Sequence, residues 1–272
     1  MTKKTVRFAA KTARTSKAKP LKSKKNSAHR KKKKRNGFHV FLFILGFCIL
    51  LFVTGIGLGY HFFHHQDVTI DASRYPVRGI DVSANNGDID FAAVAAEDYQ
   101  FAILRASYGN RHDKKFEQYY TEAKAKGLDI GAYHYLRFNM DGAQQAERFY
   151  EHIKGKAFQL PAVIDIEDWG NSLFIKKETR IQVISDMVTT LKSHGIPVMI
   201  YTNLTGHRQY IASRFDQEPL WLSALRQPEG VTDPQWTLLQ YSHTGTVSGI
   251  QGDVDLNVFT GSQNEWKQWI AQ

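Results

Sequence analysis

AVIDIED, residues 162–168, is a short apolar run that ends in three acids. Runs of this kind are typical of a buried strand in an α/β protein, where helices cover the faces of a parallel sheet. Side chains alternate along a strand, so Asp165 and Glu167 should point to the same side. Two residues advance by about 6.6 Å, which would bring both carboxyl groups into one cavity near the strand end. The segment therefore predicts a buried strand that carries a carboxylate pair.

The sequence on either side repeats the same plan of apolar run, loop and helical pattern. We predict strands at 79–82, 101–106, 130–135, 162–166, 198–201, 220–222, 237–241 and 254–258. Helical patterns occupy 91–97, 114–126, 142–154 and 177–194. Eight strands with helices between the early ones favour a parallel sheet closed into a barrel of the TIM type. The connections 223–235 and 242–253 have weak helical patterns, so the second half should be irregular.

Two further acids fall on predicted strands, Asp81 on the first and Asp255 on the eighth. In such barrels the chemistry lies at the carboxyl ends of the strands. Burying like charges together raises the pKa of one of them, and a fold tolerates this where an acid must keep its proton near neutral pH. A salt-bridged pair at the barrel rim is the structural alternative. Four acids at three strand ends favour catalysis by Glu167, Asp165, Asp81 and Asp255.

Metal binding is the other chemistry that clustered carboxylates can perform, because Mg²⁺ and Ca²⁺ prefer oxygen ligands. The domain has no H-E-x-x-H motif and no close histidine pair at ligand spacing. We therefore expect neither a metal nor a cofactor. His134 lies at a strand end, where it either touches a substrate or packs in the core.

Aromatic and polar residues gather at the same predicted edge. Aromatic rings can pack on the apolar faces of a sugar, whereas its hydroxyls need polar partners. Packing in the core is the alternative for each ring. The predicted substrate-binding residues are Arg105, Tyr133, Tyr135, Tyr201, Asn203, Trp221 and Gln240.

The N-terminal region differs from the rest in charge. Residues 1–36 hold 16 of the 36 Lys and Arg residues and no Asp or Glu, which leaves 20 basic and 26 acidic residues from Asp67 onward. The formal charge of +10 therefore belongs to a tail, and the folded domain is mildly acidic. This weakens the case for nucleic-acid binding by that domain, and no nucleic-acid partner is expected. The single cysteine, Cys48, excludes an internal disulfide.

An uncharged run, Val40–Tyr60, follows the basic tail. As a helix it would span roughly 30 Å, the thickness of a bilayer core, and it is longer than the apolar part of a signal peptide. No small-residue cleavage pattern follows it. We predict a disordered basic tail (1–37), a transmembrane helix (38–63), a linker (64–76) and a barrel (77–272). The positive-inside rule places the tail in the cytoplasm and the barrel outside the cell membrane.

The strand motifs together carry a family resemblance. In order, they are GIDVSANNGDIDF at 79–91, FAILRASYG at 101–109, GAYHY at 131–135, AVIDIED at 162–168, YTN at 201–203, LW at 220–221, LQYS at 239–242 and GDVDLNVF at 252–259. The chain from about Val77 to Phe259 resembles glycoside hydrolase family 25, the muramidases often called Chalaropsis-type lysozymes. It would be a membrane-anchored bacterial member.

The resemblance implies an irregular, flattened eight-stranded barrel that hydrolyses the β-1,4 bond between N-acetylmuramic acid and N-acetylglucosamine of peptidoglycan. By motif, Glu167 would be the proton donor and Asp165 its neighbour, with Asp81 and Asp255 as supporting acids. Tyr133, Tyr201 and Gln240 would line the cleft. The estimated spacing of the pair leaves direct attack by a carboxylate or by water open. D-x-E barrels that act on N-acetyl sugars, such as family 18 chitinases, use the N-acetyl oxygen of the substrate, and we favour that third route here.

Two alternatives to a muramidase stay open at this stage. Many family members have an acid after the second strand in a K-x-T-E-G pattern, whereas this chain has Arg105-Ala106-Ser107-Tyr108-Gly109. A wall-binding barrel with impaired catalysis is therefore one alternative. A chitinase-like glycosidase is the other.

Overall fold

The computed structural model describes residues 25–64, 70–172 and 174–271, and it divides the chain into two units, Met1–Phe63 and His64–Gln272. Residues 1–24 of the predicted tail and residues 65–69 of the predicted linker lie outside the described residues. Each unit is described by itself.

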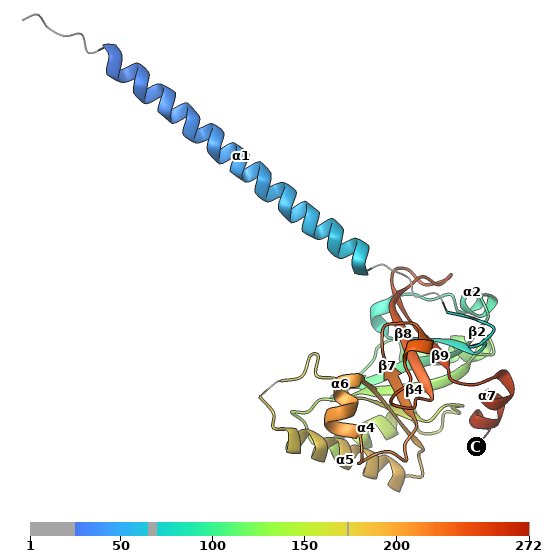
Figure 1. The fold of residues 1–272 in the computed structure, drawn as a ribbon. Coiled ribbons are helices and arrows are strands. Elements are labelled where there is room, and N and C mark those ends of the chain that lie inside the picture. The colour runs from blue at the N-terminus through green and yellow to red at the C-terminus, as the bar shows by residue number, and fades with distance from the viewer. Residues whose placement is uncertain (1–24, 65–69, 173, 272) are drawn as a thin grey trace, which may run out of the picture. The chain divides into compact units, whose positions relative to one another are not determined.

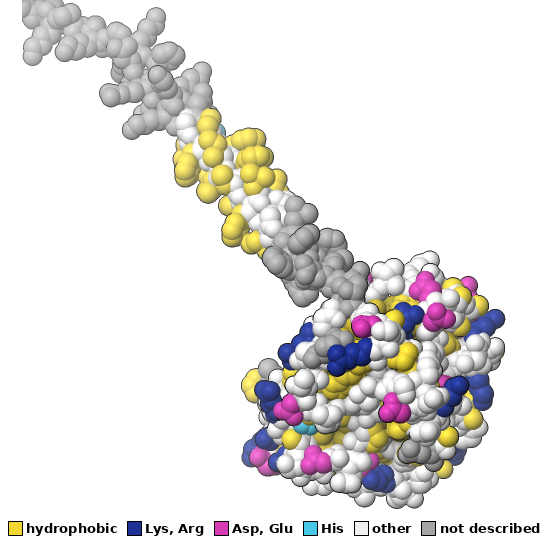
Figure 2. Space-filling model, turned by 45° about the vertical axis from the view of Figure 1, so that its right-hand side comes forward, with side chains coloured by type: hydrophobic (Ala, Val, Ile, Leu, Met, Phe, Trp, Pro, Cys, Tyr) yellow, Lys and Arg dark blue, Asp and Glu magenta, His cyan; other side chains and the backbone are white. Residues whose placement is uncertain are grey.

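The described part of the first unit is one helix, α1 (Lys25–His64). Within it, Gly37–Ile56 has a mean hydropathy of 2.6 and is long and apolar enough to cross a membrane. Its large apolar side chains are exposed, and Figure 2 shows them along the helix. Length and composition alone fit either a membrane span or a secretion signal. The helix begins inside the segment predicted to be a disordered tail, where Lys, Arg and Ala are good helix formers.

The second unit is built on one sheet that closes into a barrel. Its described strands are β1 (Arg78–Val82), β2 (Tyr99–Tyr108), β3 (Arg111–His112), β4 (Asp129–Tyr135), β5 (Ala162–Asp165), β6 (Val198–Asn203), β7 (Leu220–Ser223), β8 (Leu238–Gly245) and β9 (Val254–Phe259). Neighbours pair in the order β1-β9-β8-β7-β6-β5-β4-β2, and pairing of β1 with β2 closes the ring. Strand β3 is a short hairpin extension of β2. The predicted eight-stranded barrel is confirmed.

One strand of the barrel runs the other way. All neighbours from β1 through β2, β4, β5, β6 and β7 to β8 are parallel, whereas β9 is antiparallel to both β8 and β1. The prediction of an all-parallel sheet was therefore wrong for this strand. The link from β8 to β9 contains no helix in the structure, so β9 returns beside β8 as a hairpin.

Helices cover the outside of the early strands. They are α2 (Phe91–Ala96), α3 (Phe116–Ala125), α4 (Gly142–Ile153) and α5 (Lys177–Ser193), followed by the short α6 (Leu204–Gly206), a π-helix (His207–Ile211) and α7 (Gln263–Ile270). Short 3-10 helices occupy Ala84–Asn86 and Pro228–Gly230. Helices α4 and α5 lie side by side (Figure 1). The link from β7 to β8 has only a 3-10 turn, which agrees with the predicted irregular second half.

Alternation along the strands sorts the core into two layers. On β5, Ala162 and Ile164 pack in the outer cluster beneath the helices, whereas Val163 belongs to the cluster inside the barrel. Asp165 continues the inward series because it is two residues farther along the strand. The same alternation places Tyr201 of β6 inside the barrel. The interior of the barrel is thus apolar along β5 and becomes acidic at the end of that strand.

Candidate active site

A pocket of about 190 Å³ opens at the barrel end where the parallel strands finish. All four predicted acids line it, although they come from segments far apart in the sequence. Its lining residues are Asp81, Ser83, Asn85, Arg105, Tyr133, Tyr135, Asp165, Glu167, Trp169, Tyr201, Trp221, Gln240, His243 and Asp255. The reversed direction of β9 explains the position of Asp255, which lies near the start of that strand. The expectation that Asp255 sits at a carboxyl strand end is corrected accordingly.

The β5 end holds the acid pair. Asp165 is the last residue of the strand and is 7% exposed, and Glu167 is half-buried just beyond it. Asn171 braces the turn, because its Nδ2 donates to the carbonyls of Leu136 (3.0 Å) and Glu167 (2.9 Å) while its Oδ1 accepts from the Phe138 N–H (2.9 Å). The backbone that carries Glu167 is therefore tied to the segment after β4.

The third acid of the AVIDIED segment has a different partner. Asp168 forms an ion pair with Arg180 of α5 and accepts a hydrogen bond from the Tyr210 hydroxyl at 2.9 Å. Arg180 is buried and also donates to the carbonyls of Ile175 and Ser172. Asp168 thus fixes the loop after β5 to the helical layer rather than facing the pocket.

Asp81 is held by a chain of buried polar side chains. Gln240 and Asn257 both donate to its Oδ2, at 2.9 Å and 2.8 Å. The Trp221 indole donates to Asn257 Oδ1 (2.8 Å), and the Tyr201 hydroxyl donates to Gln240 Oε1 (2.6 Å). A fully paired network of this kind is rigid. Gln240, Trp221 and Tyr201 therefore line the pocket while they also orient Asp81.

Burial and mutual repulsion shift the acids toward their protonated forms. Burial raises the pKa of Asp165 well above its usual range, and Glu167 and Asp81 add to this rise. Burial also raises the pKa of Glu167, although the nearby charge of His243 partly offsets the effect. Burial likewise raises the pKa of Asp81 well above its usual range, and the charge of Asp255 adds to this rise. The pocket is therefore built to hold protons on carboxyl groups, as general acid catalysis requires.

One oxygen of the pair is left for a ligand. Asp165 Oδ1 is buried and has no hydrogen-bond partner among the described residues. Buried polar atoms are nearly always paired, so an orphaned one at a pocket needs an explanation. A donor on a bound substrate would supply the missing partner.

The other predicted substrate-binding residues divide into two groups. Arg105, Tyr133 and Tyr135 line the pocket; Arg105 Nε also pairs with the buried Asp113 at 2.7 Å, and its charge opposes the rise in the pKa of Asp165. Asn203 is not brought into the pocket. It is exposed, and its Oδ1 accepts from the Gly206 N–H (2.9 Å) as the N-cap of α6.

His134 is a packed core residue. Its ring is fully buried between Ser107 Oγ (2.8 Å from Nδ1) and Gln145 Oε1 (3.2 Å from Nε2). Since Gln145 Oε1 can only accept, the network assigns the proton to Nε2 and makes Ser107 the donor to Nδ1. Of the two roles left open for His134, the structure selects packing.

Four pocket residues were not among the predicted site residues: Ser83, Asn85, Trp169 and His243. Ser83 and Asn85 belong to the segment just after β1, beside the predicted Asp81, so their position in sequence was a usable signal. His243 follows the LQYS motif on β8, and only the hairpin with β9 brings it to the acids.

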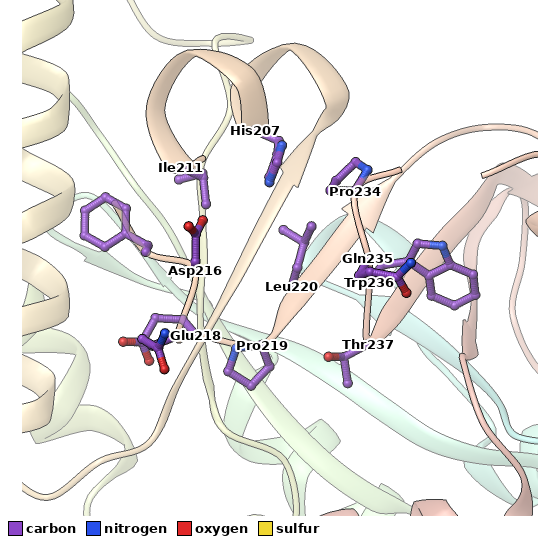
Figure 3. Close-up of a pocket in the computed structure, with 12 residues that line it drawn as sticks. His207, Ile211, Asp216, Glu218, Pro219, Leu220, Pro234, Gln235, Trp236 and Thr237 are labelled. Atoms are coloured by element: carbon purple, nitrogen blue, oxygen red, sulfur yellow. The ribbon is translucent and has the colours of Figure 1, made fainter. Parts of the chain in front are cut away.

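A larger cavity lies elsewhere, at the opposite ends of the strands. It measures about 510 Å³ and is formed where β7 and β8 begin, near Leu220 and Thr237 (Figure 3). Its acids already have structural partners: Asp216 accepts from the Ser213 N–H, and Glu218 pairs with Lys192 at 2.6 Å. The smaller pocket is therefore the candidate active site, because its acids face one another. In the described part of the chain, no three His, Cys, Asp or Glu side chains are arranged to hold a metal ion.

Known proteins with similar sequences support a glycosidase. The family model described as Glycosyl hydrolases family 25 matches residues 80–250, more than half of the chain. Autolytic lysozyme from Clostridium acetobutylicum is 30% identical over 185 residues, which cover 68% of this chain and only 56% of that protein. Lysozyme M1 from Streptomyces globisporus is 35% identical over 206 residues, which cover 68% of each chain.

The fold agrees with the sequence comparison. The solved structure of a family 25 glycosyl hydrolase from Bacillus anthracis matches with a TM-score of 0.67 and 30% identity, over 75% of this chain and 97% of that one. The resemblance carried by the strand motifs is thereby confirmed. The chain belongs to glycosyl hydrolase family 25 and is a glycoside hydrolase of the muramidase type.

Proposed function

We propose that the chain hydrolyses the β-1,4 bond between N-acetylmuramic acid and N-acetylglucosamine in peptidoglycan, with Glu167 as the general acid. The observation that carries this proposal is the convergence of four acids in one pocket at the end of the barrel. The lysozyme names of two relatives support the choice of substrate.

Glu167 is suited to protonate the glycosidic oxygen as the bond to the anomeric carbon breaks. It is half-buried, and burial raises the pKa of its carboxyl group. Within the pair Asp165 and Glu167, repulsion disfavours double ionisation, so the pair holds one proton over a wider range of pH than a lone carboxylate would. Transfer of that proton to the leaving sugar is the acid step.

Asp165 is placed to assist the substrate's own N-acetyl group. In its carboxylate form, the unpaired Oδ1 would accept a hydrogen bond from the amide N–H. The amide oxygen then attacks the anomeric carbon and forms a bond to it, while the glycosidic bond breaks and Glu167 gives up its proton. Water later opens the cyclic intermediate with Glu167 as the base. Charge that develops on the sugar is stabilised by the surrounding carboxylates.

The anchor would set where the enzyme works. We propose that α1 crosses the cell membrane once, with the basic N-terminal segment in the cytoplasm and the barrel outside. A tethered hydrolase can reach only the peptidoglycan close to its own membrane. This favours local wall remodelling.

Release of dye from labelled peptidoglycan by wild type and Glu167→Gln tests the assignment. The variant should lose at least about a hundredfold in rate, the scale of a missing general acid, with its melting temperature preserved. Glu178→Gln is a matched control, because Glu178 is an exposed acid in the first turn of α5. Full activity in Glu167→Gln would end the assignment, and equal losses in both variants would point to a general effect of the substitution.

A further inference from the structure

His243 is a pocket residue whose charge partly offsets the rise in the pKa of Glu167. It lies on β8, and its Nδ1 is 2.6 Å from Oδ1 of Asp255 on β9. Its side chain is 41% exposed and forms part of the pocket wall. His243 therefore contacts solvent on one side and an acid of the pocket on the other.

An irregularity in the β8–β9 ladder aims the ring at Asp255. Ser242 pairs with Leu256 and Gly245 pairs with Val254, with a shift of register between them. Two residues of β8, His243 and Thr244, therefore stand opposite the single residue Asp255. This is the arrangement of a β-bulge, which re-aims a side chain and is frequent next to active sites.

The charged groups that act most strongly on His243 are acids, although the cation Arg105 lines the same pocket. These acids are Asp255 on β9, Asp81 on β1, and Glu167 after β5. Burial lowers the pKa of His243, but the hydrogen bond and charge of Asp255, together with Asp81 and Glu167, outweigh it and raise the pKa above the usual value. The geometry and the charges thus both favour an imidazolium that donates from Nδ1 to Asp255.

We propose that His243 is a positioning residue of the active site: as an imidazolium it holds the Asp255 carboxylate in the pocket wall and presents a positive charge to Glu167. The proposal rests on the proposed role of Glu167 as the acid. It assigns to this chain an ion pair that sets the charge around the acid without touching the bond that breaks.

The charge of His243 should therefore adjust the pKa of Glu167. The charge of His243 lowers the pKa of Glu167 against the effect of burial, so it makes Glu167 a stronger proton donor and limits how far into alkaline pH the proton is kept. Removing the charge should let Glu167 hold its proton to higher pH. The two groups titrate as a coupled pair, which the pH profile of kcat/KM reports.

The test measures kcat/KM against pH on soluble peptidoglycan fragments for wild type, His243→Gln and His243→Lys. Glutamine can still donate a hydrogen bond but has no charge, whereas lysine restores the charge. We expect the alkaline limb to move to higher pH in His243→Gln and to stay near its wild-type position in His243→Lys. Coincident limbs for wild type and His243→Gln would overturn the proposal. So would an equal shift in both variants, because the loss of charge could not then be the cause.

NMR titration of the histidine rings in the full-length protein separates this proposal from the proposed function. The resonance missing from His243→Gln identifies His243, and its midpoint should lie above that of an ordinary histidine and fall in Asp255→Asn. An unchanged midpoint in Asp255→Asn would refute the ion pair. If the wild type cut no peptidoglycan but the midpoint still fell, the proposed function would fail while the ion pair stood.

Discussion

Asp165 keeps one buried oxygen that has no partner among the described residues, although the residues around it are densely hydrogen-bonded. Replacing the carboxylate by an amide would put either an oxygen or an N–H₂ group at that position and would remove the negative charge. We predict that Asp165→Asn lowers kcat by about a hundredfold or more, because the substrate amide loses its charged acceptor.

The melting temperature of Asp165→Asn should be unchanged or higher, since a buried acid is costly to ionise. Steady-state kinetics together with thermal unfolding check both statements. A variant with a near-normal kcat would remove Asp165 from the chemistry.

His134 is predicted to make the barrel sensitive to acid. Burial lowers the pKa of His134 to about 4 in the folded protein, although the hydrogen bond to Gln145 opposes this, and the ordinary value is 6.5. As the pH falls, the unfolded chain therefore takes up the proton at a higher pH than the folded protein does. The contribution of neutral His134 to the free energy of unfolding is present above pH 6.5 and is lost as the pH falls toward 4. The loss amounts to roughly 3 kcal/mol.

Urea unfolding at a series of pH values measures the His134 effect. The free energy of unfolding should decline between pH 6.5 and 4 more steeply in wild type than in His134→Gln. Parallel declines in the two proteins would show that His134 does not cause the acid sensitivity.

The position of a single residue in the site could be predicted where the alternation of side chains along a strand determines the direction in which it points. Asp165 and Glu167 followed from period-two alternation at the end of an apolar run, and both line the pocket. Asn203 was misplaced, because a residue at a strand end can also cap the next helix, and nothing in its neighbourhood distinguishes the two roles. His243 was missed because its position depends on a bulge, which has no clear sequence signal.

At the scale of elements, the bounds of strands were easier to predict than their direction. The predicted strand at 254–258 differs from β9 (Val254–Phe259) by one residue. Its antiparallel direction depends on whether the preceding connection crosses over the barrel or turns back. Hydrophobic pattern does not report that choice, since a buried strand has the same pattern in either direction.

Helix α7 was not predicted, although Ser262 and Glu265 form a capping box that the sequence already displays. Its Trp266 is buried against Phe101 of β2 (ring centroids 5.0 Å apart), and its indole donates to Asp129 Oδ2 at 2.8 Å. The helix therefore covers the barrel at the end where β2 and β4 begin.

Trp266→Ala should destabilise the barrel by about 3–5 kcal/mol, because it removes a large buried ring and leaves Asp129 without its donor. Trp269→Ala is the matched control: Trp269 lies on the same helix and is only half-buried, so a smaller loss is expected. Chemical denaturation of both variants compares them. Equal losses would show that α7 does not seal the barrel through Trp266.

At the scale of the whole molecule, the apolar part of α1 separates a basic segment from an acidic domain. We predict that the full-length protein stays with bacterial membranes during alkaline extraction. Protease added to intact spheroplasts should digest the barrel and spare the N-terminal segment. A soluble product whose N-terminus lies beyond residue 60 would instead show that the helix is a cleaved signal.

The central claim is that this pocket cuts one defined bond of the glycan strand. Mass analysis of the products of peptidoglycan digestion, after reduction of the new sugar ends, tests it most directly. We predict reduced N-acetylmuramic acid at every new end and none with Glu167→Gln. Reduced N-acetylglucosamine at those ends, or an undigested polymer with active wild-type protein in the assay, would contradict it.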